Sequence, residues 1–245
     1  MDTIRITDVG DTAFNVEFGT IIDPAINAKV MSLRQAVRQA QDQGGLAGLI
    51  ETIPTFRSLL VHYDPLLTSR SELEGDIRAI ADGCADTPVG VTRCWTIPVC
   101  YQADLGEDLA EVAMACKMTP DQVIARHSQA EFKVYMLGFM PGFAYMGGLP
   151  QELHLPRRAS PRLKVPPGSV AIADALCAVY PWESPGGWHL IGQTPAHFFD
   201  LERAPPILLA AGDKVRFRAI DRDEYDRCRR DPHRVAPERL LTEGL

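Results

Sequence analysis

The sequence has no excess of positive charge. Its 245 residues include 25 lysines and arginines against 32 aspartates and glutamates, which gives a net charge of −7. A protein that binds nucleic acid without sequence preference needs a basic excess to neutralise phosphates, so we expect no nucleic-acid partner. The same negative charge argues against an anionic membrane as a partner.

Long apolar runs are also missing. The most apolar stretch, residues 134–149, is broken by Pro141 and by several glycines, whereas a membrane-spanning helix needs roughly 20 uninterrupted apolar residues. The first residues contain no basic segment followed by an apolar run, so we expect no signal peptide. These absences predict a soluble, cytoplasmic protein.

Residue types that commonly bind metals or phosphate lack the required spacing. The six cysteines include no C-x-x-C pair, a pattern typical of reduced, mostly buried thiols in the cytosol. The six histidines show neither H-x-H nor H-E-x-x-H spacing, so no metal site is predicted. A phosphate loop of the form G-x-x-x-x-G-K-S/T is missing as well.

The first part of the chain has the pattern of a small α+β unit. Residues 12–18 alternate between apolar and polar side chains, as in a half-buried strand. Asp23 as N-cap and Pro24 at the first helical position predict the start of a helix that Gly44 stops. Two further strands and a second helix are expected over 46–53, 57–63 and about 69–81. This order suggests a ferredoxin-like or related split αβ layer.

The character of the chain changes around residues 86–88, and we place a domain boundary between residues 88 and 89. Eleven of the 19 prolines fall between Pro141 and Pro206, interleaved with glycines. Short strands between dense turns indicate an all-β barrel or sandwich with long ordered loops. The charged residues 221–245 are expected to form a peripheral helix or a loose tail. The other predicted elements are helices over about 105–117 and 120–127 and strands over 95–99, 133–138, 169–173, 176–180, 188–191 and 214–220.

Two motifs in the helical segment have simple interpretations. Residues 109–127 have the outline of a helix-turn-helix, but Glu111 and Asp121 lie among the exposed positions and the overall charge is wrong for DNA. Lys117 lies in a Met-Ala-Cys-Lys-Met segment that is similar to the lysine motif of biotin carriers. That lysine belongs on a tight β-turn, whereas Lys117 lies on a helical pattern. We therefore expect a solvated lysine and no biotin on this chain.

A cationic loop is the first candidate for chemistry. Four cations fall within nine residues of this acidic chain: Arg157, Arg158, Arg162 and Lys164. The flanking prolines stiffen the loop, and guanidinium groups bind carboxylate or phosphate in bidentate fashion, which favours an anionic substrate or a nucleotide. A solvated basic loop or a docking patch for a partner is the alternative. Arg162 is expected to be an exposed charge without a buried partner.

Glycine-rich segments with aromatic residues are the second candidate. Phe143 and Tyr145 lie among the glycines of residues 138–148, and Trp188 follows a Gly-Gly pair. Such segments let a backbone approach a ligand closely and supply a wall for a ring. Backbone amides and the hydroxyl of Thr194 can donate hydrogen bonds to a developing oxyanion. The alternative is a barrel loop with an aromatic plug.

In their order along the chain, these segments resemble one family. The resemblance is carried by KVYMLGFMPGF (133–143), GGLP (147–150), the PRRASPR loop (156–162), SPGGW (184–188) and IGQTP (191–195). The N-terminal part agrees through SLLVHYDP (58–65), so the resemblance spans nearly the whole chain except the charged tail. The family is that of the 5-oxoprolinase B subunit, earlier labelled allophanate hydrolase subunit 1. It also contains the Kip-type inhibitor of a sporulation histidine kinase.

The resemblance implies an α+β protein: a small N-terminal α/β sandwich over 1–88 and a cyclophilin-like β-barrel with the charged tail over 89–245. It implies partners, the C and A subunits of 5-oxoprolinase, and a complex that opens 5-oxoproline to L-glutamate with hydrolysis of ATP, expected with magnesium. The chain is then inactive without its partners. Two alternatives stay open: a module that inhibits a sensor histidine kinase, and a carboxyltransferase-like subunit of a urea amidolyase system.

The residues suit this chemistry. A lactam is a resonance-stabilised amide and a poor electrophile, so its hydrolysis needs activation. Phosphorylation of the amide oxygen would make that oxygen a leaving group, and cations are then needed against the transferring phosphoryl group. We predict catalytic roles for Arg157, Arg158 and Arg162. The residues predicted to bind the substrate are Phe143, Tyr145, Lys164, Trp188 and Thr194. Neither a nucleophile nor a general base is evident.

Overall fold

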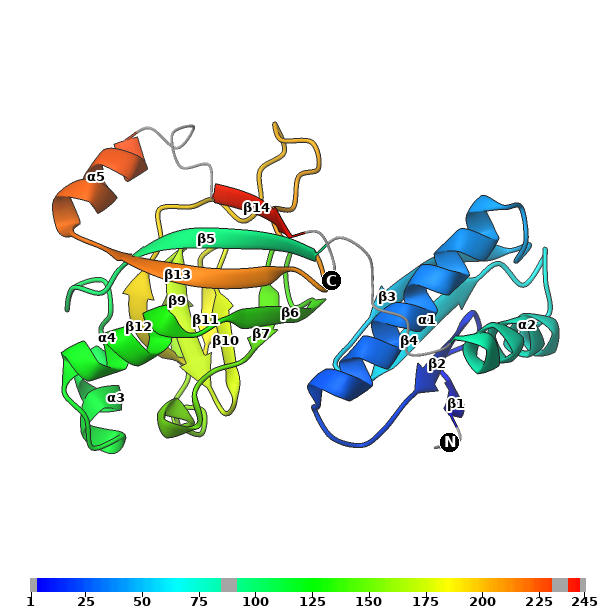
Figure 1. Cartoon of the computed structure of the whole chain (residues 1–245), viewed down its shortest axis with the longest axis horizontal. Helices are drawn as coiled ribbons and strands as arrows, with labels where there is room; N and C mark the ends of the chain where they lie inside the picture. Colours follow the sequence, from blue (N-terminus) through cyan, green and yellow to red (C-terminus); the bar gives the residue numbers. More distant parts are fainter. Residues whose placement is uncertain (1–3, 85–91, 231–237, 243–245) are drawn as a thin grey trace. The chain divides into compact units, whose positions relative to one another are not determined.

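The chain divides into two compact units, residues 1–91 with 244–245 and residues 92–243 (Figure 1). The structure, a computed structural model, describes residues 4–84, 92–230 and 238–242. The domain boundary predicted between residues 88 and 89 therefore lies outside the described residues. No helix in the described ranges is long and apolar enough to cross a membrane.

The first unit is a four-stranded antiparallel sheet with two helices. Its strands follow the order β1-β2-β4-β3, and α1 packs on β3, β4 and α2. The elements are β1 (Arg5–Asp8), β2 (Ala13–Glu17), α1 (Pro24–Asp42), β3 (Leu49–Pro54), β4 (Ser58–Tyr63) and α2 (Arg70–Gly83). The sequence pattern does not predict β1, because four residues with one clear apolar side chain show no alternation. This strand fills the edge beside β2 and completes a split αβ layer.

Local signals start both helices of this unit. The side chain of Asp23 accepts hydrogen bonds from the backbone N–H groups of Ala25 and Ile26, and Pro24 occupies the first turn, so the predicted start of α1 is confirmed. Helix α2 begins with a capping box formed by Ser69 and Glu72. The core beneath the helices contains Phe14, Val16, Val30, Leu33, Val37, Leu59, Val61, Leu73 and Ile77.

The second unit is a closed β-barrel. Seven strands follow the order β12-β9-β10-β7-β6-β13-β5, and the pairing of Gln193 in β12 with Cys100 in β5 closes the ring. The β-barrel expected from the sequence is confirmed. The strands are β5 (Thr92–Cys100), β6 (Phe132–Leu137), β7 (Ala144–Gly147), β9 (Ser169–Ala173), β10 (Leu176–Val179), β12 (His189–Gln193) and β13 (Lys214–Ile220).

Several elements of this unit differ from the sequence-based prediction. The charged end of the chain forms α5 (Arg222–Arg230), which confirms the predicted helix over the loose tail. It also forms β14 (Glu238–Thr242), a strand that the sequence did not predict and that pairs with β5. Helices α3 (Leu109–Ala115) and α4 (Pro120–Gln129) confirm that two helices occur here, but α3 is shorter than the predicted 105–117. Lys117 lies in the turn between them with φ of +56°, not on a helix. The prediction misses the barrel strand β7, which lies in a segment expected to be a glycine-rich loop. It also misses a ribbon of β8 (Arg162–Val165) and β11 (Ser184–Gly186) within the proline-rich region and the short η1 (Gln151–Leu153).

A buried carboxylate ties the loop before β13 to β5. Asp213 accepts hydrogen bonds from Arg93 Nε at 2.8 Å and Nη2 at 2.9 Å and from Trp95 Nε1 at 2.9 Å. It also accepts one from the backbone N–H of Ala210 at 2.8 Å. A buried charge is tolerated when it is paired and fully hydrogen-bonded, which is the case for Asp213.

We predict that Asp213→Ala lowers the free energy of unfolding by about 2–4 kcal/mol, because it leaves the buried Trp95 Nε1 and the half-buried Ala210 N–H without an acceptor. All three tryptophans lie in the second unit, so urea unfolding followed by tryptophan fluorescence reports on this unit alone. The exposed Glu202, whose side chain has no partner among the described residues, provides the control. Glu202→Ala should change stability by less than about 0.5 kcal/mol, and an equal effect of the two variants would contradict the prediction.

Candidate functional site

Two of the predicted catalytic arginines bind a buried carboxylate. Arg158 Nη1 lies 2.9 Å from Asp108 Oδ1, and Arg162 Nη2 lies 2.5 Å from the same oxygen. The other carboxylate oxygen of Asp108 accepts a hydrogen bond from the backbone N–H of Leu190 at 2.7 Å. Glu111 adds a second partner to Arg158 at 2.9 Å. Asp108 therefore joins the start of α3, the cationic loop and β12.

This arrangement corrects the expectation that Arg162 has no buried partner. The side chain of Asp108 is 4% exposed, and Asp108 lies 54 residues from Arg162 in the sequence. A local sequence pattern therefore cannot predict this ion pair. The two guanidinium groups still have spare donors: Arg158 Nε and Arg162 Nη1 are buried and have no hydrogen-bond partner among the described atoms. The catalytic role of both arginines stays a prediction.

Arg157 lies in a different environment. It is exposed, forms no ion pair with any carboxylate in the described part of the chain, and its guanidinium carbon lies 5.9 Å from the centre of the Trp188 ring. Its charge also reaches Tyr145 and Tyr180, where burial raises the pKa of each phenol and Arg157 partly opposes that rise. Burial raises the pKa of Tyr180 to about 12. Arg157 thus adds positive charge beside an aromatic cluster.

That aromatic cluster contains three residues predicted to bind the substrate. The Phe143 ring lies 4.8 Å from that of Tyr145 and 6.1 Å from that of Trp188, in edge-to-face geometry. Phe143 and Trp188 are buried, which fits the aromatic plug, whereas Tyr145 is partly exposed. Lys164 is not an unpaired cation near these rings. Its ammonium group lies 3.2 Å from Glu183 on an exposed surface. The predicted substrate-binding residues therefore fall into separate places.

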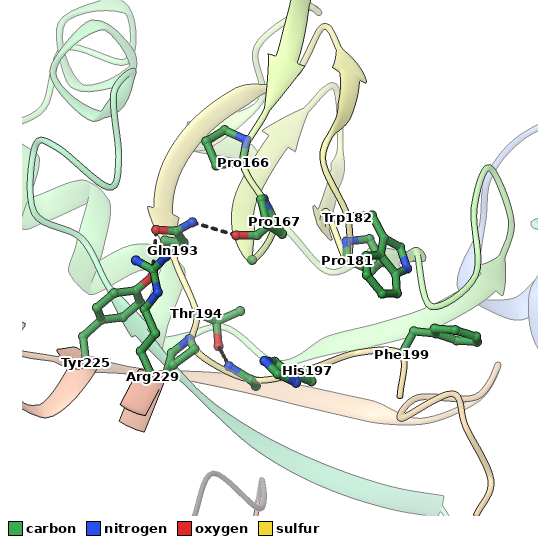
Figure 2. Close-up of a pocket in the computed structure, with 13 residues that line it drawn as sticks. Pro166, Pro167, Pro181, Trp182, Gln193, Thr194, His197, Phe199, Tyr225 and Arg229 are labelled. Atoms are coloured by element: carbon green, nitrogen blue, oxygen red, sulfur yellow. Dashed lines mark hydrogen bonds between the residues drawn. The ribbon is translucent and has the colours of Figure 1, made fainter. Parts of the chain in front are cut away.

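A cavity of about 500 Å³ lies next to this cluster (Figure 2). Thr194 is the predicted site residue that lines it. Trp182, which lines the cavity, lies two residues after Tyr180, whose ring centre is 5.2 Å from that of Phe143. Phe199 also lines the cavity, and it lies so close to Gly142 that an added Cβ there would be 3.0 Å from the Phe199 Cβ. These two connections place the cavity and the cluster side by side.

Sequence reasoning missed most of the cavity lining. Trp182, Phe199, His197, Tyr225 and Arg229 come from separate segments, including a helix in the charged tail. Prolines from three loops complete the wall. The IGQTP motif carries part of the family resemblance, but a motif alone does not show which of its side chains faces a cavity. In the charged tail, no sequence motif indicated that Tyr225 or Arg229 lines a cavity.

Gln193 holds two sides of the cavity together. Its Nε2 donates to the carbonyl of Pro167 at 2.6 Å, and its Oε1 accepts from the hydroxyl of Tyr225 at 2.8 Å (Figure 2). Tyr225 is buried, which raises the pKa of its phenol. Because both polar atoms of the Gln193 amide are used, this side chain positions the cavity wall and α5.

A buried cysteine–histidine pair elsewhere in the barrel is not a catalytic dyad. His127 Nε2 lies 3.4 Å from Cys177 Sγ, and His127 Nδ1 lies 2.8 Å from the hydroxyl of Tyr101. Burial raises the pKa of the Cys177 thiol and lowers the pKa of His127 to about 3, so thiol and imidazole are both neutral. Both side chains are fully buried, and no group of three potential metal ligands occurs among the described residues.

The comparisons with known proteins point to one family. The carboxyltransferase domain, subdomain C and D, matches residues 4–209. The B subunit of 5-oxoprolinase from Bacillus subtilis strain 168 is 38% identical over 235 residues, covering 90% of this chain and 95% of that protein.

Solved structures share the fold. The crystal structure of TTHA0988 in space group P212121 superposes with a TM-score of 0.74 at 32% identity, covering 89% of this chain. This chain spans only 40% of the TTHA0988 chain. The urea carboxylase of Kluyveromyces lactis superposes with a TM-score of 0.76 over 98% of this chain and 24% of its own, at 18% identity. At that identity the likeness concerns the fold alone.

We predict that the barrel becomes less stable below pH 6.5, because His127 is then protonated in the unfolded chain but not in the folded one. In the unfolded state the imidazole protonates near pH 6.5, whereas in the folded state it stays neutral down to about pH 3. The unfolded state therefore binds one more proton in this window, and stability falls as the pH falls. This residue should remove about 1.4 kcal/mol between pH 7.5 and pH 5.5. In urea unfolding followed by tryptophan fluorescence, His127→Phe should show a pH dependence smaller by that amount. Identical pH dependence in the two proteins would contradict the assignment.

We also predict that substitutions of a paired arginine and of an exposed arginine change the stability of the protein by different amounts. Arg162→Ala should lower the free energy of unfolding by about 1–2 kcal/mol, since Asp108 keeps Arg158 but loses one charge-assisted hydrogen bond. The matched variant Arg157→Ala should change it by less than about 0.5 kcal/mol, because the side chain is exposed. The same fluorescence-detected urea titration measures both. A larger loss for Arg157→Ala would mean that the Asp108 pairs are not what holds the loop.

Proposed function

The chain belongs to the family of the 5-oxoprolinase B subunit, and from this membership we propose that it is one subunit of a complex that opens 5-oxoproline to L-glutamate with hydrolysis of ATP. The observation that carries the proposal is the match to the Bacillus subtilis protein, which extends over 95% of that protein. The family model matches residues 4–209, which lie in both units of the chain and include the aromatic cluster.

In the proposed reaction, each bond that forms is matched by one that breaks. The lactam oxygen attacks the γ-phosphorus of ATP, and ADP leaves with the electron pair of the broken P–O bond. Water then adds to the activated carbon, and the ring C–N bond breaks with a proton transferred to nitrogen, which leaves the acyl phosphate of glutamate. A second water hydrolyses this acyl phosphate to L-glutamate and inorganic phosphate. In this scheme the chain binds and orients the substrate and places positive charge near the transferring phosphoryl group. We propose Arg157 for that charge, because it is exposed and pairs with no described carboxylate.

The described residues of this chain do not form a magnesium site by themselves. Magnesium prefers oxygen ligands, mainly carboxylates and phosphates, and no three potential ligands converge in the described ranges. We therefore propose that the nucleotide and its magnesium are bound mainly by partner subunits. No step of the proposed reaction is assigned to a metal on this chain.

The C and A subunits of the family form part of the proposal as partners. The Bacillus subtilis relative is named as a B subunit, which implies other subunits in a complex. The length of TTHA0988 supports a partner, since this chain spans 40% of it and the remainder is joined covalently there. A segment that is fused to others in one protein is well suited to bind them as separate subunits in another.

We predict that the purified chain alone shows no ATP hydrolysis dependent on 5-oxoproline, and that activity appears when the A and C subunits are added. The reason is that the chain supplies neither a phosphate loop nor a converged set of ligands among its described residues. Coupled measurement of ADP and glutamate provides the test.

Mixtures that omit one component at a time are the controls. Equal activity with and without this chain would contradict the proposal, as would full activity of the chain by itself. Loss of activity combined with tight inhibition of a sensor histidine kinase would favour the regulatory alternative.

A further inference from the structure

The cavity described above has a polar side and an apolar side. Gln193, Tyr225 and Arg229 lie on one side of it, and Trp182 and Phe199 lie on the opposite side (Figure 2). The rings of Trp182 and Phe199 contact each other with centres 6.0 Å apart, so they form one continuous apolar wall. A ligand that fits this arrangement has one polar end and one apolar face.

The charge on the polar side is positive. Arg229 is exposed and forms no ion pair with a carboxylate of the described segments, and no aspartate or glutamate lines the cavity. The helix that carries it is fixed at the cavity: Tyr225, one turn earlier, is buried and donates to Gln193. Arginine binds a carboxylate through two parallel hydrogen bonds, which gives both affinity and orientation.

Thr194 supplies a hydrogen-bond donor between the two sides. The residue is 3% exposed, and its Oγ1 accepts a hydrogen bond from the backbone N–H of Ala196 at 3.1 Å. No described group accepts the hydrogen of this hydroxyl, so the hydroxyl keeps a donor that a ligand in the cavity can use. The close approach of Gly168 fixes this edge, since an added Cβ would lie 2.4 Å from the Thr194 carbonyl oxygen.

We propose that this cavity is the binding subsite for a small cyclic amide acid, with Arg229 on the carboxylate, Thr194 donating to the ring amide oxygen, and Trp182 and Phe199 against the ring face. The assignment rests on the proposed function and names the place of its substrate on this chain. A five-membered ring with one carboxylate does not fill about 500 Å³, so space remains beside it for the group that reacts.

Substitution of Arg229 in the reconstituted complex tests the assignment. Arg229→Ala should raise KM for 5-oxoproline by roughly 10- to 100-fold, which is the usual effect of losing a hydrogen bond to a charged group. Arg229→Lys should restore part of the loss, because an ammonium group cannot form the bidentate pair. Arg229→Glu should be worse than alanine. KM for ATP should stay within about twofold in all three, since the nucleotide is assigned elsewhere.

Arg227→Ala is the matched control. It removes an exposed arginine from the same helix that does not line the cavity, and KM for both substrates should be unchanged. Gel filtration with the partner subunits verifies assembly of each variant.

The outcomes separate the two levels of the proposal. An active complex whose KM for 5-oxoproline is the same in wild type, Arg229→Ala and Arg229→Glu overturns the subsite and leaves the proposed function intact. A parallel rise in KM for ATP, or failure to assemble, assigns Arg229 to structure or docking and also overturns the subsite. A wild-type complex without hydrolysis dependent on 5-oxoproline overturns the function itself.

Discussion

The buried carboxylate of Asp108 is the interaction on which the geometry of the cationic loop depends. One of its oxygens binds Arg158 and Arg162, and the other accepts the backbone N–H of Leu190. An isolated buried carboxylate is costly, so Asp108 requires these partners, and the partners in turn are held by it. A loop rich in proline and arginine is thereby fixed to the barrel at a defined place. Arg157, at the start of the same loop, is left exposed over Trp188.

Strand β12 connects this anchor to the cavity. Its second residue, Leu190, binds Asp108, and its last residue, Gln193, closes the barrel on Cys100. The Gln193 side chain also bridges Pro167 and Tyr225. All five residues of the strand are buried, so its position is set by the barrel core on one side and by these polar contacts on the other. A displacement at either end would therefore move Thr194, which directly follows it.

The sequence predicted elements well where local chemistry determines them. The bounds 169–173 and 214–220 agree with β9 and β13, and α4 begins at residue 120 as predicted, with a capping box at Thr119. Features that depend on contacts between distant segments were not predictable from local patterns: Asp108 lies about fifty residues from its arginines, and β14 forms only because β5 offers an edge. Resemblance to a family supplied the barrel itself, which periodicity left open as a barrel or a sandwich. The cavity collects residues from loops and from α5, so no single motif outlined it.

Charge explains why the cations of this acidic protein differ in what they can do. A guanidinium already paired with a buried carboxylate offers an anion little net attraction, because the charge of the pair is close to neutral. That is the state of Arg158 and Arg162, and Glu107 and Glu111 reinforce it. Arg157 and Arg229 pair with no carboxylate among the described residues, and each stands beside an aromatic surface (Figure 2). In a chain of net charge −7, such local exceptions decide where an anion binds, since the surrounding negative field disfavours it elsewhere.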